Sequence, residues 1–439
     1  MKSYRVITLG CKVNQCESAA VGHLLEQCGY VHARQDHTPD TVVINTCTVT
    51  SKAAMQSRQA IRKSVRAYPD AHIVVTGCHA EIAAEQVGAM EGVHLVVGNT
   101  DKMRLATLLA EPVHDAGFQR PTADPSVLGG PCFAPMPAVS REDRTRAFLK
   151  VQDGCNTRCT YCIVPYTRGP SRSMPEAEVE THIRRLAEQG LREVVLTGIH
   201  LGAYGSDLVP ATSLTLLIDR LTRKPLVDRI RVSSIEPTEI SPSLVDLFAS
   251  RPERLCPHFH VPLQSGDNRL LRRMGRPYTR EQYAAVIHDI RHRLPRAAIG
   301  VDVMAGFPGE GDDAFAQTCE LIASLPITYL HVFPFSPRHG TPAEKFTSKI
   351  PQRVAKERCQ HLRRLGENKR QDFLRTMMGQ QTTVLIQTLS ADTPGEAFGI
   401  SDNYLPIKMT GGPYQENSLV RAEIRGISDD GRLIGTDRL

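Results

Sequence analysis

Hydrophobic and polar positions follow two alternating patterns along the first part of the chain. Short apolar runs, typical of buried strands, are separated by longer stretches in which apolar residues recur every three or four positions, as in amphipathic helices. The predicted strands are residues 4–10, 41–46, 72–77 and 93–98, and the clearest helical patterns are residues 17–28 and 52–67. Strands that alternate with helices predict a parallel sheet flanked by helices.

A second alternation of strands and helices runs from about residue 143 to 350. Residues 112–140 before it are rich in Pro, Gly and small polar residues, which predicts a linker. Six or so repeated strand–helix units predict a full or partial (β/α) barrel. The predicted strands are residues 146–151, 193–197, 230–234, 258–261, 300–305 and 329–334.

The last part of the chain changes character twice. Residues 351–376 have a helical and strongly basic pattern, whereas residues 377–439 carry β-branched runs, Gly-rich turns and no convincing helix. The latter pattern is typical of a small β-barrel. We therefore predict an α/β protein with an N-terminal parallel-sheet domain, a central partial (β/α) barrel and a C-terminal small β-barrel. The predicted boundaries are 1–112, a linker at 113–140, 141–375 and 376–439.

Composition narrows the class of protein. The chain has 439 residues, of which 41% are hydrophobic, so it can bury the cores of two or three domains. Its formal net charge of +6 permits a nucleic-acid partner without requiring one. No apolar run approaches the length of a membrane span, and the N-terminus lacks a signal-peptide pattern, so we expect a cytoplasmic protein without a membrane partner. In that setting, twelve cysteines are more often metal ligands or catalytic groups than disulfides.

Three cysteines fall within one octapeptide, directly after the predicted strand 146–151. They are Cys155, Cys159 and Cys162. The loop after a barrel strand lies on the catalytic face. A closed 4Fe-4S site usually takes four cysteines, and no fourth lies nearby, so the spacing predicts a cluster with one open iron. The alternatives are a structural zinc site, whose usual second ligand pair is not evident, or three unrelated thiols.

A second set of cysteines is spread over the first domain. Cys11, Cys47 and Cys78 each follow a predicted strand, so neighbouring parallel strands would bring all three to the carboxyl edge of one sheet. Open α/β sheets bind ligands at this edge. Three convergent thiols without a His predict a second iron–sulfur cluster. The alternative is three buried structural cysteines, since free Cys is among the most buried residue types.

The octapeptide resembles the signature of the radical S-adenosylmethionine (SAM) superfamily. Its pattern is Cys155-x-x-x-Cys159-x-Tyr161-Cys162. This resemblance implies that the three cysteines bind a 4Fe-4S cluster and that SAM binds the open iron through its amino and carboxylate groups. It also implies that Tyr161 lies near the adenine and that SAM is cleaved to a 5′-deoxyadenosyl radical, with the cofactor carrying the difficult chemistry.

The residues around the other three cysteines resemble the N-terminal domain of the methylthiotransferases. The matching strings are LGCKVNQ at 9–15, NTCTVT at 45–50 and TGC at 76–78, and the resemblance extends over nearly the whole chain, including a TRAM-like C-terminal barrel. It implies two 4Fe-4S clusters, SAM, and insertion of a methylthio group at an unactivated C–H bond. No catalytic residue beyond the cluster ligands is predicted.

Strings 12–15, 48–50 and 399–404 resemble the branch of this family that acts on threonylcarbamoyladenosine beside the tRNA anticodon. Cys16 and Pro170 depart from the more usual pattern. The resemblance implies a 2-methylthio product, a tRNA anticodon stem-loop as partner and an electron donor such as a flavodoxin or ferredoxin, and leaves the sulfur donor open. Alternatives are methylthiolation of another tRNA adenosine or of a ribosomal protein, or a non-catalytic RNA-binding iron–sulfur sensor.

Several residues at the predicted strand ends are candidates for holding SAM. Glu236 and Gln264 would face the barrel mouth, where ordinary strand-end solvation is the alternative explanation of their polarity. The resemblance implies that Thr197 and Gly198 hold the methionine amine, and Asp302 opens a family-like string. The predicted cofactor-binding residues are Tyr161, Thr197, Gly198, Glu236, Gln264 and Asp302.

Positive charge is concentrated in segments 52–66, 269–280 and 353–375. Phosphate contacts supply much of the affinity for RNA, so these segments are candidate RNA-binding tracks, although solvated helix faces would look the same in the sequence. The loop at 168–172 adds two arginines. The candidate RNA-binding residues are Arg58, Arg62, Lys63, Arg168, Arg172, Arg272 and Arg273.

Overall fold

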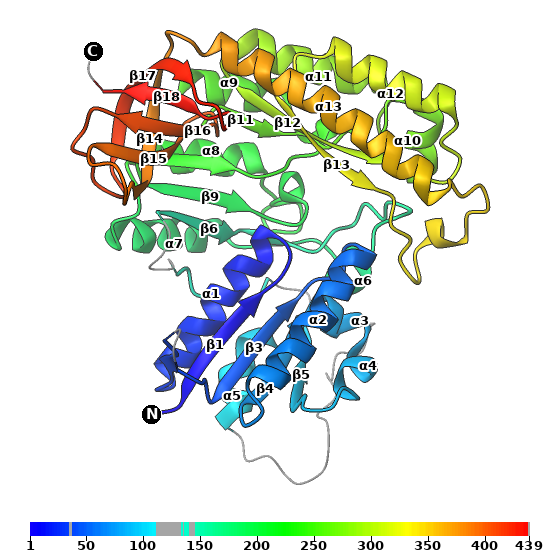
Figure 1. Ribbon diagram of the computed structural model, residues 1–439, viewed down its shortest axis with the longest axis vertical. Coiled ribbons are helices and arrows are strands. Elements are labelled where there is room, and N and C mark those ends of the chain that lie inside the picture. Colours follow the sequence, from blue (N-terminus) through cyan, green and yellow to red (C-terminus); the bar gives the residue numbers. More distant parts are fainter. Residues whose placement is uncertain (35–36, 111–132, 135, 140–144, 438–439) are drawn as a thin grey trace.

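A computed structural model describes residues 1–34, 37–110, 133–134, 136–139 and 145–437. Most of the predicted linker lies outside these residues. Figure 1 shows an N-terminal α/β domain beneath a central α/β domain, with a C-terminal β-barrel at one end of the central strands. Within the described parts of the chain, no helix combines the length and the hydropathy needed to cross a bilayer.

The N-terminal domain contains the predicted parallel sheet. Its strand order is β2 (Val31–His32), β1 (Ser3–Thr8), β3 (Thr41–Thr46), β4 (His72–Gly77) and β5 (Leu95–Val97), with every neighbouring pair parallel. The helices are α1 (Lys12–Gln27), α2 (Ser51–Ala67), α3 (Cys78–Ile82), α4 (Ala84–Gly88) and α5 (Leu105–Ala110).

Alternate side chains of the central strands pack into two separate cores. Val43 and Val74 pack on one face of the sheet with Leu25 of α1, whereas Val42 and Ile73 pack on the other face with Ile61 of α2. This burial on both faces explains the continuous apolar runs in the sequence, because a strand covered by helices on both sides needs no polar face. The predicted architecture of this domain is confirmed.

The central domain has six parallel strands in two linked sheets. One sheet has the order β10 (Arg229–Val232), β9 (Glu193–Thr197) and β6 (Arg146–Lys150), and the other has the order β11 (His258–His260), β12 (Ala298–Ala305) and β13 (Tyr329–Pro334). Single β-bridges from Ile230 to Leu255 and from Ser234 to His260 join them. The six strands therefore form a partial barrel that is open between β6 and β13, as predicted.

Helices and a small hairpin complete the central domain. Figure 1 shows α7, α8, α9, α11, α12 and the long α13 on the outside of the strands. The hairpin pairs β7 with β8 in antiparallel fashion and encloses the octapeptide. The bounds are β7 (Gln152–Asp153), α6 (Val164–Arg168), β8 (Arg172–Ser173), α7 (Glu176–Glu188), α8 (Leu214–Arg223), α9 (Pro242–Ser250), α10 (Asn268–Met274), α11 (Arg280–Arg293), α12 (Asp312–Ser324) and α13 (Gln352–Thr376).

The C-terminal strands close into a barrel with an apolar core, as predicted. The barrel order is β14 (Gln381–Leu389), β15 (Glu396–Ser401), β16 (Pro406–Thr410), β18 (Leu433–Thr436) and β17 (Leu419–Ile427). It docks on β10 through two buried arginines, since Arg229 donates to the carbonyl of Thr383 and Arg231 to that of Asp402. The small barrel therefore covers the ends at which the central strands begin.

The N-terminal domain lies across the opening of the partial barrel and contacts both of its edge strands. On the β6 side, the Sγ of Cys16 in α1 donates to the carbonyl of Phe148 at 3.1 Å. On the β13 side, Arg338 in the loop after the strand donates to Oγ1 of Thr48 at 2.6 Å. This docking brings the carboxyl edge of the first sheet to the mouth of the partial barrel.

Candidate active site

Cys11, Cys47 and Cys78 follow the adjacent strands β1, β3 and β4, so the structure brings all three to one sheet edge. Cys11 directly precedes α1, and Cys78 is the first residue of α3. Gly10 makes the close approach possible: its φ is +101°, and a Cβ there would lie 2.9 Å from the Cys47 Sγ. The charges of Cys78 and Cys11 also act on Cys47, which places the thiols within electrostatic reach of one another.

The second triad lies in the loop that the β7–β8 hairpin closes. The amide of Cys155 donates to the carbonyl of Gly169 at 3.1 Å, and the amide of Thr160 donates to that of Met274 at 2.9 Å. Gly154 has a φ of +73°, and a Cβ on it would lie 1.9 Å from the carbonyl oxygen of Pro170. The backbone of the octapeptide is therefore held from both sides.

The thiols of each cysteine triad are too far apart for a single ion to bind all three of them in this arrangement. One zinc ion with bonds of about 2.3 Å needs thiol sulfurs about 4 Å apart. Among the residues that the structure describes, neither cysteine triad forms a group whose ligand atoms all lie within 4.8 Å of one another. Burial raises the pKa of Cys47 to about 11 and that of Cys162 to about 12, so both thiols are protonated at neutral pH when no metal is bound. Because iron binds the thiolate, cluster binding must release these protons.

Polar side chains surround the octapeptide. His200 lies 3.5 Å from the Cys155 Sγ through Nδ1 and 2.7 Å from Glu239 through Nε2. On the other side, Arg276 donates to the Cys159 Sγ at 3.4 Å and forms an ion pair with Glu236. Each contact connects a cysteine to a carboxylate through one cationic or ionisable group.

The predicted SAM residues lie at the mouth of the partial barrel, with one exception. Thr197 ends β9 and Gly198 follows it, Glu236 lies just beyond β10, and Gln264 follows β11 with a φ of +68°. Tyr161 packs edge-on against Phe307, with ring centroids 6.4 Å apart.

Asp302 is the exception, since it lies within β12 rather than at its end. Its Oδ1 lies 2.8 Å from Nε2 of His260 and 3.3 Å from Nδ1 of His331. One oxygen of this carboxylate, which the sequence predicts to bind SAM, is thus paired with both imidazoles.

Comparison with known proteins places this arrangement in a family. The radical SAM superfamily model matches residues 149–322, and the model of the uncharacterized protein family UPF0004 matches residues 3–98. The threonylcarbamoyladenosine tRNA methylthiotransferase MtaB of Bacillus subtilis is 35% identical over 95% of this chain and 92% of its own length. The MtaB of Aquifex aeolicus is 37% identical over 95% and 98%. The chain belongs to the MtaB-type methylthiotransferase family.

Two further similarities set the limits of this MtaB-type assignment. A tRNA-2-methylthio-N(6)-dimethylallyladenosine synthase of Pelotomaculum thermopropionicum is 32% identical over 97% of this chain and 96% of its own. Among solved structures, the radical SAM methyltransferase TsrM of Kitasatospora setae has a TM-score of 0.55 at 17% identity, covering 76% of this chain and 73% of that one, which shows the fold alone. Membership of the MtaB-type family implies SAM and 4Fe-4S clusters as cofactors, with a second cluster in the N-terminal domain.

Two residues predicted to bind RNA in this MtaB-type chain are buried, which corrects that part of the prediction. Arg168 is 2% exposed and Arg172 is 7% exposed. Arg168 pairs with Glu17 and Asp153, so its guanidinium is not open to a phosphate. In contrast, Arg62, Lys63, Arg272 and Arg273 are exposed and Arg58 is half-buried.

A buried ion-pair network surrounds Glu17, a residue that no sequence pattern marks as functional. Its carboxylate lies 2.6 Å from Lys102, 3.1 Å from Lys150 and 2.8 Å from Arg168. Burial alone would raise the pKa of Glu17, but the three cations hold it well below its usual value. No spacing signals such a network, because its members are far apart in the sequence. It joins α1, which follows Cys11, to the segment that leads into Cys155.

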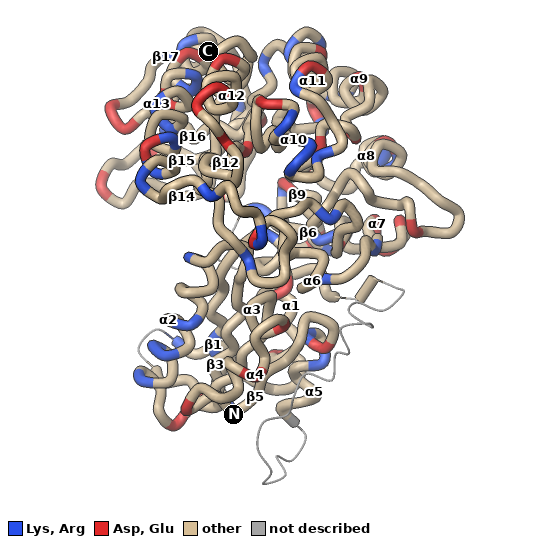
Figure 2. The backbone as a smooth tube through the Cα atoms, turned by 90° about the vertical axis from the view of Figure 1, so that its right-hand side faces the viewer, with Lys and Arg blue, Asp and Glu red and all other residues tan. Residues whose placement is uncertain are grey.

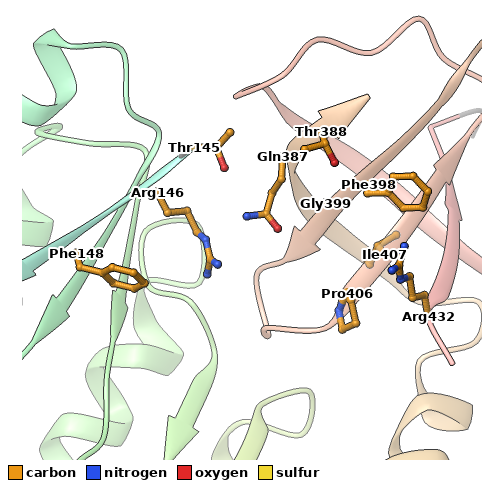
Figure 3. A pocket seen from close by; sticks show the side chains of 10 residues that line it. All are labelled: Thr145, Arg146, Phe148, Gln387, Thr388, Phe398, Gly399, Pro406, Ile407 and Arg432. Carbon is orange, nitrogen blue, oxygen red and sulfur yellow. The ribbon is translucent and has the colours of Figure 1, made fainter. Parts of the chain in front are cut away.

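A cleft beside the C-terminal barrel contains none of the six predicted cluster cysteines. It encloses about 640 Å³ between β6 and the C-terminal barrel. Figure 3 shows Arg146 and Phe148 facing Gln387 and Pro406 across it. None of its lining residues is a cysteine, and it lies toward the ends at which the central strands begin, away from both triads.

Proposed function

We propose that this chain converts threonylcarbamoyladenosine beside the tRNA anticodon to its 2-methylthio derivative. One observation carries the proposal: residues 168–169 contact both cysteine sites. The carbonyl of Gly169 accepts from the amide of Cys155, and the neighbouring Arg168 guanidinium donates at 2.8 Å to Oδ1 of Asn14, to which the Cys11 Sγ also donates at 3.9 Å. The names of the relatives from Bacillus subtilis and Aquifex aeolicus supply the substrate.

In this proposal each cysteine triad holds one 4Fe-4S cluster. Cys11, Cys47 and Cys78 hold the first, and Cys155, Cys159 and Cys162 hold the second. When bound, the clusters and SAM supply a radical that removes hydrogen from carbon 2 of the adenine, and the sulfur and methyl group that replace it. A flavodoxin- or ferredoxin-type protein supplies electrons, and the reaction takes place in the cytoplasm.

The residues of the chain bind and orient the reactants. Tyr161 would pack on the adenine of SAM. Thr197 and Gly198 would accept hydrogen bonds from the methionine amine of SAM. Glu236, held in place by Arg276, and Gln264 would contact its polar groups. The target adenine must enter between the two triads, which requires a base that is splayed out of a single-stranded loop.

Alanine variants of the two triads test the proposal. Replacing Cys155, Cys159 and Cys162 is expected to abolish formation of 5′-deoxyadenosine from SAM, measured by liquid chromatography of the reduced protein. Replacing Cys11, Cys47 and Cys78 is expected to preserve 5′-deoxyadenosine but to abolish the 2-methylthio nucleoside, measured by mass spectrometry of digested tRNA. The matched control is Cys28→Ala, because Cys28 is exposed and belongs to neither triad.

Three outcomes contradict the proposal. A wild-type protein that forms no 5′-deoxyadenosine would be a non-catalytic iron–sulfur protein. Loss of 5′-deoxyadenosine in both sets of variants would mean that the cluster assignments are wrong. A 2-methylthio group on a different tRNA nucleoside, or a methylthio group on a ribosomal protein, would show that the proposed substrate is wrong.

A further inference from the structure

The floor of the partial barrel, the end at which its strands begin, carries more positive than negative charge. The Glu193 carboxylate of β9 lies 2.6 Å from Arg229, 2.9 Å from Arg231 and 3.7 Å from Arg146. The three arginine side chains are between 1% and 16% exposed, and Glu193 is fully buried. One carboxylate balances only one of these three cations, and a buried charge is costly unless it is paired.

Lys12 adds a further cation to the same region. Its Nζ lies 6.0 Å from the centre of the Tyr404 ring, which Arg146 faces at 5.6 Å and Arg231 at 5.1 Å. Lys12 is half-buried, and within the described residues its ammonium has no carboxylate or carbonyl partner at hydrogen-bond distance. Lys12 directly follows Cys11, so its backbone adjoins the first cysteine triad while its ammonium reaches toward the ring of Tyr404.

A polar row leads from this floor toward the opening of the barrel. His260, Asp302 and His331 lie on neighbouring strands, with Asp302 and His331 in register. Their side chains are 12%, 23% and 53% exposed, so the row becomes more accessible from β11 to β13. The single carboxylate of Asp302 is shared by both imidazoles.

His258 shows that these groups converge on one place. Burial lowers the pKa of His258 well below its usual value, and the charges of Arg231, His260, Lys12 and His331 lower it further. Groups from α1, β10, β11 and β13 therefore act on the same buried ring. Among these groups, four cations (Lys12 and the three arginines) outnumber two carboxylates (Glu193 and Asp302), which favours the binding of an anion.

We propose that Lys12, with His331 across the barrel interior, binds the carboxylate of the threonylcarbamoyl group on the substrate adenine. This inference rests on the proposed function. The threonylcarbamoyl group ends in a carboxylate, whereas a dimethylallyl group is apolar and would leave the Lys12 ammonium unpaired. A threonylcarbamoyl group anchored at Lys12, the residue after Cys11, would direct the adenine that carries it toward the first triad. The backbone phosphates stay outside the barrel when a base is splayed into it.

The test compares three anticodon stem-loop RNAs that differ at one nucleotide. One carries threonylcarbamoyladenosine, the second carries its neutral methyl amide, and the third carries adenosine. Affinity is measured by fluorescence anisotropy with the anaerobically reconstituted enzyme. A hydrogen bond to a charged group corresponds to a preference of about tenfold to hundredfold, so we expect this preference for the carboxylate over the amide.

Variants at Lys12 and His331 assign the preference to this site. Lys12→Met is expected to reduce binding of the carboxylate RNA to the level of the amide RNA and to leave the amide RNA unchanged. The control is Lys224→Met, since the Lys224 side chain is 54% exposed and pairs with Glu180. Because Lys12 adjoins Cys11, iron content is measured for each variant. His331 is farther from the cysteines in sequence. His331→Asn is also expected to lower the affinity for the carboxylate RNA and to leave the affinity for the amide RNA unchanged.

The outcomes separate this inference from the proposed function. If Lys12→Met weakened all three RNAs equally, Lys12 would contact a phosphate and the inference would be wrong. Equal affinity of the wild-type enzyme for the carboxylate and amide RNAs would also overturn it, even with full methylthiolation. If the enzyme methylthiolated none of the three RNAs, the proposed function would fail, whatever the binding data showed.

Discussion

At the scale of single residues, Arg276 connects the cysteine loop to the predicted SAM site. Its guanidinium donates to Sγ of Cys159 and to the hydroxyl of Tyr278, and it pairs with Glu236. The side chain is only 3% exposed, so its orientation is fixed by these partners. Since Glu236 lies at the barrel mouth beyond β10, Arg276 is a positioning residue that holds this carboxylate in place.

Replacing Arg276 should weaken SAM binding more than it weakens the retention of iron. In Arg276→Gln, Glu236 loses its counter-charge, and a lost hydrogen bond to a charged group costs about 1.5–3 kcal/mol. We therefore expect the dissociation constant for SAM, measured by equilibrium dialysis, to rise at least about tenfold, with partial recovery in Arg276→Lys. Arg280→Gln is the control, since Arg280 bonds instead to Gln317. Loss of iron from Arg276→Gln but not from the control would show a role in cluster retention instead.

At the scale of elements, β9 and β10 hold the C-terminal barrel through one carboxylate. Glu193 on β9 pairs with Arg229 and Arg231, which lie two residues apart on the same face of β10. The arginines then donate to four backbone carbonyls of the small barrel, at Thr383, Ile400, Ser401 and Asp402. Removing Glu193 would leave both buried arginines without a counter-charge.

The stability that Glu193 supplies should depend on pH. Burial alone would raise its pKa, but Arg231 and Arg229 lower it from 4.5 to about 2. A carboxyl whose pKa is lower in the folded state stabilises the fold above the unfolded pKa, and this contribution is lost as the pH falls from about 4.5 to about 2. Glu193→Gln should therefore destabilise the protein at pH 7, by about 3–5 kcal/mol.

Thermal unfolding followed by circular dichroism at pH 7, 5 and 3 measures this effect. The melting temperature of the wild type should fall toward that of Glu193→Gln as the pH decreases. The control is Glu357→Gln, because Glu357 is 55% exposed. A constant difference between wild type and Glu193→Gln across this range would contradict the pKa assignment.

The sequence predicts elements well where one periodicity decides them. Strand 41–46 was predicted without error because both of its faces are buried, so its apolar run has the bounds of the strand. The two-residue strands β7 and β8 have no periodicity, since their pairing depends on the loop that they enclose. Arg168 was misassigned because its partners Glu17 and Asp153 become neighbours only when the first domain docks. Charge counts within a segment cannot reveal such a partner.

At the scale of the whole molecule, the exposed positive charge lies on two domains. Figure 2 shows Lys and Arg residues on α2 of the N-terminal domain and on α10 of the central domain. Arg62 and Lys63 on α2, and Arg272 and Arg273 on α10, are exposed. These two helices belong to the two domains that carry the cysteine triads. An RNA held by both would therefore be fixed relative to both triads.

Replacing these four residues with Gln should reduce the salt dependence of RNA binding. Each lost phosphate contact lowers the slope of log K against log salt concentration by about 0.7 for single strands and about 0.9 for duplexes. We expect the slope of the double variant on either helix to fall by about 1.4–1.8, measured by filter binding between 50 and 300 mM KCl. Since phosphates carry no information about the modified base, the affinities for the carboxylate, amide and unmodified RNAs should all fall by the same factor.

Arg220→Gln with Arg223→Gln on α8 is the matched control, because both side chains are at least 60% exposed on a different helix. An unchanged slope in both test variants would mean that RNA approaches by another face, and selective weakening of the carboxylate RNA would place these arginines in the base pocket.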